Sequence, residues 1–498
     1  MSLRINYGGW FERKSPGLFR LTLFGTVGLG VGIMLILIVQ QRAENWGISG
    51  LLAFGLALFE LFYGWKYDGK TLARRRAEKR NVARMAKRGE NSYVTGAAAA
   101  LAGSYGGHPM PGVLASTEIL HERDGRDTPF DVIHYPLQGL FAVSLRCYPE
   151  GRGTNDQDTV DMMVAKYGAW LHDRVSPDEG LVGATVTIDS FQGTGVQLRE
   201  NVRGNRHPNA PAAASRVMDA VVDELPTGLS DLVGYATLVW RKSAMTVETA
   251  TDADVVVEIA KRLPGHMDAL TAGGAGDPTP MLEPDLVETA RLAYKPSDQE
   301  AFDELRAREE VVQLRWEDAG PSFLSEPASR KVLHHDGGSS FTLEMRLPPR
   351  GTVYENHLLR LLRPSSVFLR KRVTIFYQPV SIEKGQSTAE AAVRAEDFAA
   401  SQKKGRRTAT IARDGRVATA LDAQLAEGAS LVPFSIMATC TFEDDTESER
   451  LARNTLRSLM TSSRMRVREV SGLQAPAFHL TLPFGIVPWE FSDNPIWK

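Results

Sequence analysis

Apolar residues first gather in two long runs near the start of the chain. Leu21 to Val39 contains no charged residue, and Gly47 to Gly64 contains only Glu60. At ~1.5 Å per residue, a helix of either length crosses a hydrocarbon core of roughly 30 Å. The link from Gln40 to Trp46 has room only for a turn, and a cleavable signal would have a shorter apolar region. The pattern predicts a two-helix transmembrane hairpin over residues 1–66.

Basic residues flank this hairpin on both outer sides. The turn carries Arg42, offset by Glu44, whereas the flanks carry many more positive charges. Because lysine and arginine favour the cytoplasmic side, both termini are expected in the cytoplasm and the protein in the cell membrane as a two-pass protein. The basic flanks consist of Arg4, Arg13, Lys14 and Arg20 before the hairpin, and Lys66, Lys70, Arg74, Arg75, Arg76, Lys79, Arg80, Arg84, Lys87 and Arg88 after it.

Small residues suggest how the two helices pack. Gly28-x-x-x-Gly32 and Ala53-x-x-x-Ala57 are spacings that let backbones approach closely, although glycine is also common in membrane helices generally. Glu60 has two interpretations: it reaches back toward the basic end, or it faces a partner within the membrane.

Residues 67–112 are predicted to form a basic juxtamembrane helix and a flexible tether. The helix runs from Lys70 to Arg88, and such clusters attract anionic lipid headgroups by about 1 kcal/mol per basic residue. The alternative is that these charges only set the topology. Ala97 to Gly112 is rich in Ala, Gly and Pro, which is typical of a tether.

From residue 113 onward, strand and helix patterns alternate. A first α+β domain is predicted over 113–245, a mainly helical region over 246–335 with a linker at Thr271 to Pro280, and a second α+β domain over 336–498. The order β-β-α-β-α-β in the first domain favours antiparallel or mixed sheets with helices on one face. The expected fold class is therefore membrane-anchored α+β, and two related, ferredoxin-like half-domains are one arrangement the pattern allows.

The individual elements follow from periodicity. The predicted elements of the first domain are two strands within Asp131–Cys147, a helix at Thr159–His172, a strand at Ala184–Ile188, a helix at Ala214–Leu225 and a strand at Leu232–Trp240. Those of the last region are strands at Phe341–Arg346 and Val373–Val380, a helical stretch from Thr388, a strand at Phe434–Phe442, a helix from Thr446, and short strands at Met465–Val470 and Phe478–Leu482.

Composition narrows the function classes. The chain has 498 residues and a net charge of −2, which argues against a surface built throughout for nucleic acid, and no direct nucleic-acid site is evident. Its only cysteines, Cys147 and Cys440, lie in apolar stretches. A disulfide framework is therefore not expected, and buried reduced thiols fit a cytoplasmic body.

One segment near the end of the second apolar run matches a specific nucleotide-binding motif. Gly64 to Thr71 fits G-x-x-x-x-G-K-S/T, the phosphate-binding loop. That loop works between a buried strand and a helix, whereas this segment follows a predicted membrane helix and carries Trp65 and Tyr67 at the headgroup level. Nucleotide binding is not expected here.

Other candidates are explained by local structure. Asp156, Asp158 and Asp161 precede or open a helix, where carboxylates favour the dipole over calcium binding. His334 and His335 are adjacent, so on a strand they point to opposite faces and cannot share a metal. Three glycines lie in a linker and do not follow a strand: Gly273, Gly274 and Gly276. No catalytic, cofactor-binding or metal-binding residue is predicted, and no cofactor.

The layout resembles a known architecture. The matching features are the hairpin, the entry Pro111-Gly112-Val113-Leu114, the stretch Gly180-Leu181-Val182, and the segment Ala477 to Gly485. These resemble a family of actinobacterial two-span membrane proteins encoded with conjugation-type (type IV-like) secretion systems. In that family plan, a hairpin subunit is joined to the non-motor, N-terminal region of the secretion ATPase.

The resemblance implies a non-enzymatic subunit that scaffolds or docks a separate P-loop ATPase, together with other membrane subunits in an oligomeric complex. No ATPase activity is implied, because no motor follows Gly485 in this sequence. The alternatives are a type VII secretion component and a membrane-tethered enzyme with a site invisible in sequence. Trp489 and Trp497 are expected either to dock on their own body or to face a partner.

Overall fold

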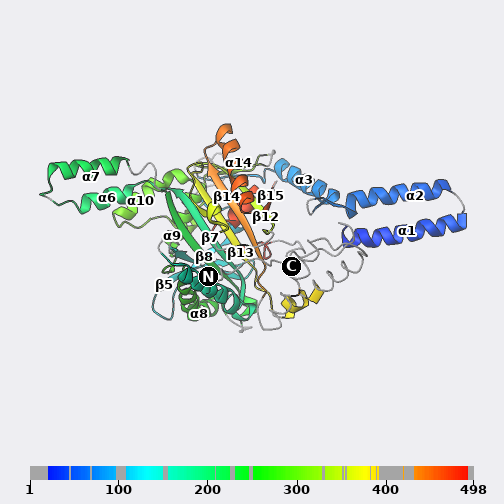
Figure 1. The fold of residues 1–498 in the computed structure, drawn as a ribbon, viewed down its shortest axis with the longest axis horizontal. Helices are drawn as coiled ribbons and strands as arrows, with labels where there is room; N and C mark the ends of the chain where they lie inside the picture. Colours follow the sequence, from blue (N-terminus) through cyan, green and yellow to red (C-terminus); the bar gives the residue numbers. More distant parts are fainter. Residues whose placement is uncertain are drawn as a thin grey trace. The chain divides into compact units, whose positions relative to one another are not determined.

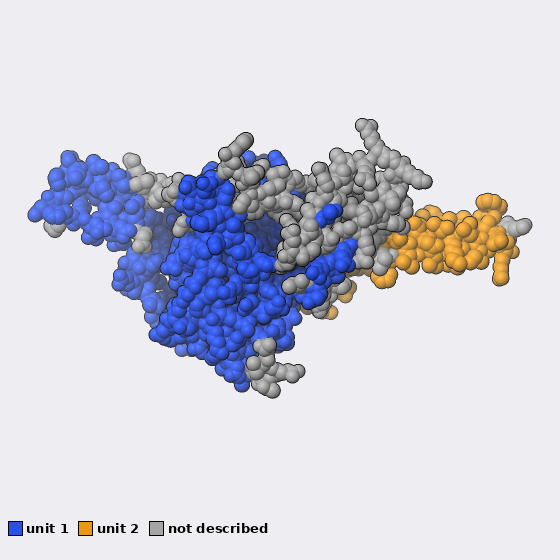
Figure 2. Space-filling view, turned by 60° about the horizontal axis from the view of Figure 1, so that its bottom comes forward, with its two compact units in different colours: residues 1–10, 92–498 blue, residues 11–91 orange. Residues whose placement is uncertain are grey.

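The computed structural model divides the chain into two compact units, residues 11–91 and residues 1–10 with 92–498 (Figure 2). Each unit is described separately below. The structure describes residues 21–43, 46–67, 70–96, 108–149, 155–207, 209–224, 230–245, 251–327, 331–349, 353, 356–381, 383–388, 390–391, 419, 431–470 and 472–491.

The smaller unit begins with two apolar helices, α1 (Leu23–Ala43) and α2 (Trp46–Phe59). A π-helical turn, η1 (Glu60–Gly64), extends α2. Two segments of 19 residues in this stretch, Phe24–Arg42 and Trp46–Gly64, are long and apolar enough to cross a membrane. Only 6% of the first and 11% of the second is buried in the protein. The predicted hairpin is therefore present as two apolar helices whose side chains are largely exposed.

Glycines on α1 make the close approach between these helices possible. A Cβ at Gly28 would lie 2.9 Å from Phe59 Cε1, and one at Gly32 would lie 2.5 Å from Leu56 Cδ1. The glycine spacing therefore allows the predicted close approach, whereas Ala53 and Ala57 of the second spacing are exposed and take no part in it. Large side chains of α2 instead fill the space that the glycines leave open.

The basic segment follows as a short antiparallel pair, β1 (Lys66–Tyr67) with β2 (Lys70–Thr71), and then α3 (Leu72–Lys87). Thr71 caps α3, since its hydroxyl accepts a hydrogen bond from the Arg74 amide at 3.3 Å. The predicted basic helix is confirmed, and it buries none of its residues. Residues 97–107 of the predicted tether lie outside the described residues, whereas residues 108–112 pack on the larger unit, where Met110 is part of the core.

The larger unit is built on one antiparallel sheet of 13 strands (Figure 1). Its order is β3-β10-β11-β12-β14-β13-β7-β8-β6-β5-β4, with β15 beside β12 and β9 beside β6. The three predicted soluble segments all contribute strands to it. The strands are β3 (Ser92–Val94), β4 (Glu118–Arg123), β5 (Pro129–Tyr135), β6 (Leu140–Cys147), β7 (Leu181–Gln192), β8 (Ser230–Arg241), β9 (Thr279–Pro280), β10 (Phe323–Ser325), β11 (Leu333–His335), β12 (Gly338–Leu347), β13 (Arg370–Tyr377), β14 (Phe434–Phe442) and β15 (Arg466–Glu469).

Helices cover both faces of this sheet. One face packs against α5 and α8 over the first half, and against α11 and α14 over the second half. The other face packs against α9, α15 and the chain that follows α15. The helices are α5 (Gln157–Asp173), α6 (Val196–Gly204), α7 (Ala212–Glu224), α8 (Asp252–Ala272), α9 (Glu283–Tyr294), α10 (Gln299–Ala307), α11 (Leu359–Leu362), α14 (Thr446–Ser462) and α15 (Gln474–Leu480).

The order of elements occurs twice in this unit. β6-α5-β7-β8-α8-β9 is followed later by β12-α11-β13-β14-α14-β15, with strand orders β9-β6-β8-β7 and β15-β12-β14-β13. Both are the ferredoxin-like arrangement. The first, however, takes α8 and β9 from the region predicted as mainly helical, and the helix counted at 214–225 belongs to an insertion, α6 and α7, between β7 and β8. The halves join edge to edge where β7 pairs with β13, from Phe191 opposite Arg370 to Ala184 opposite Tyr377.

Three sequence-based assignments differ from the structure or lie partly outside the described residues. The strand predicted at Phe478–Leu482 is wrong, because most of this segment belongs to helix α15. The helix predicted at Ala214–Leu225 is confirmed as α7 up to Glu224, but it projects from the sheet with α6, and its Val217 is 62% exposed (Figure 1). Most of the helical stretch predicted from Thr388 lies outside the described residues.

Candidate functional site

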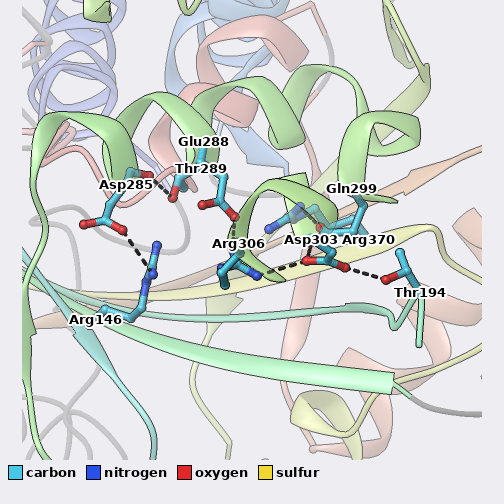
Figure 3. A network of polar contacts seen from close by, with 9 residues as sticks. All are labelled: Arg146, Thr194, Asp285, Glu288, Thr289, Gln299, Asp303, Arg306 and Arg370. Atoms are coloured by element: carbon cyan, nitrogen blue, oxygen red, sulfur yellow. Dashed lines mark hydrogen bonds and ion pairs between the residues drawn. The ribbon is translucent and has the colours of Figure 1, made fainter. Parts of the chain in front are cut away.

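A layer of paired charges lies between the sheet and helices α9 and α10 (Figure 3). Arg146 on β6 pairs with Asp285 on α9 at 3.2 Å. Arg306 on α10 pairs with Glu288 on α9 and, at 2.9 Å, with Asp303. Each charge in this part of the layer therefore has an opposite charge beside it, and these pairs tie α9 to the sheet and α10 to α9.

The layer continues toward the junction of the two half-domains. Asp303 accepts hydrogen bonds from the Thr194 hydroxyl at 2.5 Å and from Gln299 Nε2 at 3.0 Å. Gln299 Oε1 in turn lies 3.5 Å from Arg370 Nη1. Arg370 on β13 then reaches Asp189 on β7, with Nε 2.8 Å from Oδ2. This last bond crosses the β7–β13 junction.

Asp189 and Arg370 form a buried ion pair, with side chains 1% and 3% exposed. Burial opposes the charge on Arg370, but the Asp189 carboxylate outweighs it and keeps the pKa of this guanidinium above its usual value. Tyr235 also faces this pair, and burial raises the pKa of its hydroxyl. Such a pair holds two elements in register.

The segment that matches a phosphate-binding loop has a different geometry from one. It contains the antiparallel β1–β2 pair, and residues 68 and 69 lie outside the described range. Lys70, the residue that would contact phosphates, has its ammonium 2.8 Å from Glu78 of α3. Because the loop requires a strand-to-helix connection in a parallel sheet, the observed context does not support this motif.

Of the aspartates near residue 156, one caps helix α5 as expected and the other two lie within the helix. Asp156 caps α5 by accepting a hydrogen bond from the Thr159 amide at 2.8 Å, and this bonding lowers the pKa of its carboxyl group. Asp158 lies in the first turn, and Asp161 accepts from Gln157 Nε2 at 2.8 Å. Across the described residues, no group of three or more His, Cys, Asp or Glu side chains is arranged to hold a metal ion.

The two adjacent histidines point to opposite faces of β11. His334 Nδ1 lies 2.9 Å from Asp444 Oδ1, whereas His335 is buried between the Tyr294 carbonyl and the Ser340 hydroxyl. Burial lowers the pKa of His335 to about 4, so its ring is neutral. The linker glycines have local roles: Gly273 ends α8, and Gly274 and Gly276 adopt left-handed conformations.

The segment from Ala477 to Gly485, which carries part of the family resemblance, is buried across the sheet. The Pro483 carbonyl accepts from the Ser144 hydroxyl at 2.5 Å, and the Phe484 carbonyl accepts from the Tyr135 hydroxyl at 2.6 Å. Trp489 is 6% exposed and donates to the Val182 carbonyl at 2.7 Å. Trp489 therefore docks on its own body, and Trp497 lies outside the described residues.

Comparison with known proteins adds no identity. No protein-family model matches the chain, and no curated protein is similar to it.

The buried charges at the half-domain junction were missed by the sequence analysis. Asp189 and Arg370 are 181 residues apart, so only the fold brings them together. The one available signal was the run Arg370-Lys371-Arg372 at the start of a strand that continues with Val373 and Phe376. All three basic residues are buried.

Proposed function

We propose that this protein is a non-enzymatic, two-pass membrane subunit of a type IV-like secretion system. Its role is to hold a separate P-loop ATPase at the cytoplasmic face of the cell membrane. The observation that carries the proposal is a pair of apolar, largely exposed helices followed directly by a basic helix, on a chain that continues into a large α+β unit.

Charge asymmetry supports the cytoplasmic placement of that unit. Helix α3 exposes several cations to its surroundings, and no residue of it is buried. Because positive charges are retained on the cytoplasmic side and attract anionic headgroups, α3 fits a position at the inner membrane surface. The exposed basic side chains of α3 and its cap are Arg76, Lys79, Arg80, Arg84, Lys87 and Arg88.

The polar groups of the larger unit support a structural role. Its charged layer consists mainly of mutual ion pairs, which join β6 to α9, join α9 to α10, and brace α10 internally (Figure 3). Groups that perform acid–base chemistry are instead placed at a cleft where substrate can reach them. The function therefore fits a scaffold that presents a rigid surface to other subunits.

Recovery of the complex from its native host tests this proposal. The full chain, tagged and purified in detergent, is expected to co-purify with a P-loop ATPase. In cells that lack this protein, that ATPase is expected to leave the membrane fraction. A matched control replaces only α1 and α2 with an unrelated two-helix hairpin, which should preserve binding. An ATPase that stays on the membrane without this protein and never co-purifies with it would contradict the proposal.

A further inference from the structure

Arg372 stands apart from the other buried cations of the larger unit. It lies on β13, two residues from Arg370, and is 1% exposed. None of its three guanidinium nitrogens, Nε, Nη1 and Nη2, has a hydrogen-bond partner among the described residues. A buried guanidinium with no bonded partner is costly, because it loses its hydration without replacement.

The surroundings of Arg372 compensate its charge only in part. The nearest carboxylate is Asp189, its register neighbour on β7, which bonds to Arg370 through Oδ2 and leaves Oδ1 unbonded. One negative charge thus faces two positive charges. Burial lowers the pKa of Arg372 to about 10, which still leaves the group charged at neutral pH.

The other titratable groups around Arg372 supply no negative charge. Tyr294 and Tyr235 are buried and remain protonated, because burial raises the pKa of each. His335 and His479 have pKa values lowered to about 4 and are neutral. Phe478 places its ring 4.6 Å from the guanidinium carbon, which stabilises the cation from one side but accepts no hydrogen bond in the guanidinium plane.

From this arrangement we infer that Arg372 is the centre of a buried site for a small inorganic monoanion of chloride size. Such an ion accepts hydrogen bonds from the three free nitrogens and balances the net positive charge of Arg370, Arg372 and Asp189. Water alone would satisfy the donors but would leave the charge in place. The site lies at the junction of the half-domains, so the anion joins the bonds that hold β7 against β13.

Thermal unfolding of the full chain in detergent tests the site. Tryptophan fluorescence is followed at constant ionic strength while sodium gluconate is replaced by sodium chloride or bromide. A ligand that binds only the folded state raises Tm with the logarithm of its concentration. The wild type should show this rise with both halides, and Arg372→Met should show no halide-specific rise.

Arg453→Met is the matched control. The Arg453 guanidinium carbon also lies over an aromatic ring, 4.9 Å from the centre of Phe341, but its nitrogens are bonded to Glu449 at 2.9 Å and Glu469 at 3.4 Å. This variant should keep the wild-type halide response. If Arg372→Met does not fold, chloride-35 NMR of the wild type provides the second readout, with line broadening expected from exchange into a protein site.

Two results would overturn the inference. Equal melting of the wild type in all sodium salts, without chloride-35 broadening, would mean that the site holds water only. A halide response that persists in Arg372→Met would place the anion elsewhere.

Discussion

Asp189 is the carboxylate on which the buried charges at the half-domain junction depend. Replacing it with asparagine removes the buried carboxylate that Arg370 and Arg372 share. We expect Asp189→Asn to lower the free energy of unfolding by about 3–5 kcal/mol, measured by urea denaturation. Asp219→Asn is the control, since its pair with Arg206 is exposed, and a change below about 0.5 kcal/mol is expected. Equal effects of the two variants would contradict this role.

Buried histidines should make the stability depend on pH. His266, His335 and His479 have folded pKa values lowered to about 3, 4 and 4 by burial, against an ordinary value of 6.5. Between pH 6.5 and 4 the unfolded chain binds more protons than the folded chain, so stability falls as the pH is lowered through this range.

The measurement is the urea midpoint between pH 7 and pH 5, before most carboxylates titrate. His479→Gln should reduce the slope, because it removes one of the buried rings that the unfolded chain protonates first. A wild-type midpoint that is constant from pH 7 to pH 5 would mean that these rings are not held neutral.

Among the elements, the pair of apolar helices α1 and α2 offers a test of its glycine packing. Gly32→Leu should separate α1 from α2, because a Cβ there already meets Leu56. Gly30→Leu is the control, since nothing lies within 4 Å of its Cβ position. The readout is the yield of crosslinking by a short thiol reagent between Gln40→Cys and Ser49→Cys. The native side chains at these two positions are hydrogen-bonded to each other. Loss of crosslinking in both variants would refute the specific role of Gly32.

The C-terminal segment is a second element whose packing can be tested. Trp489 fills a site on β7 and bonds to the Val182 carbonyl. We expect Trp489→Ala to lower the free energy of unfolding by about 3–5 kcal/mol. Leu137→Ala should have little effect, because Leu137 is 80% exposed. An unchanged urea midpoint for Trp489→Ala would show that this tryptophan does not contribute to the core.

Periodicity predicted most elements but failed at this segment for a physical reason. Phe478, Leu480 and Leu482 alternate with His479 and Thr481, which is typical of a strand with one buried face. In the structure four of these five residues are buried, including His479 and Thr481, because the segment lies within the core against the sheet. When every side is covered, alternation no longer distinguishes a strand from a helix.

At the scale of the whole molecule, the sequence predicted the hairpin, the basic helix and the repeated α+β rhythm. It did not predict that the two halves share one sheet. The residues of β7 and β13 mark them as strands, but nothing in their sequence specifies that they pair with each other. The charged layer was also beyond prediction, since its members come from β6, β7, α9, α10 and β13. Only their pairing in space shows that most of these charges are structural.

Cysteine labelling in intact cells tests most directly the claim that a membrane hairpin holds this body in the cytoplasm. Single probes are placed at Ser2, Asn45 and Lys498 after Cys147 and Cys440 have been replaced by alanine. We predict that a membrane-impermeant thiol reagent labels Asn45→Cys and leaves Ser2→Cys and Lys498→Cys unlabelled until the cells are lysed. Labelling of Lys498→Cys in intact cells, or protection of Asn45→Cys, would contradict it.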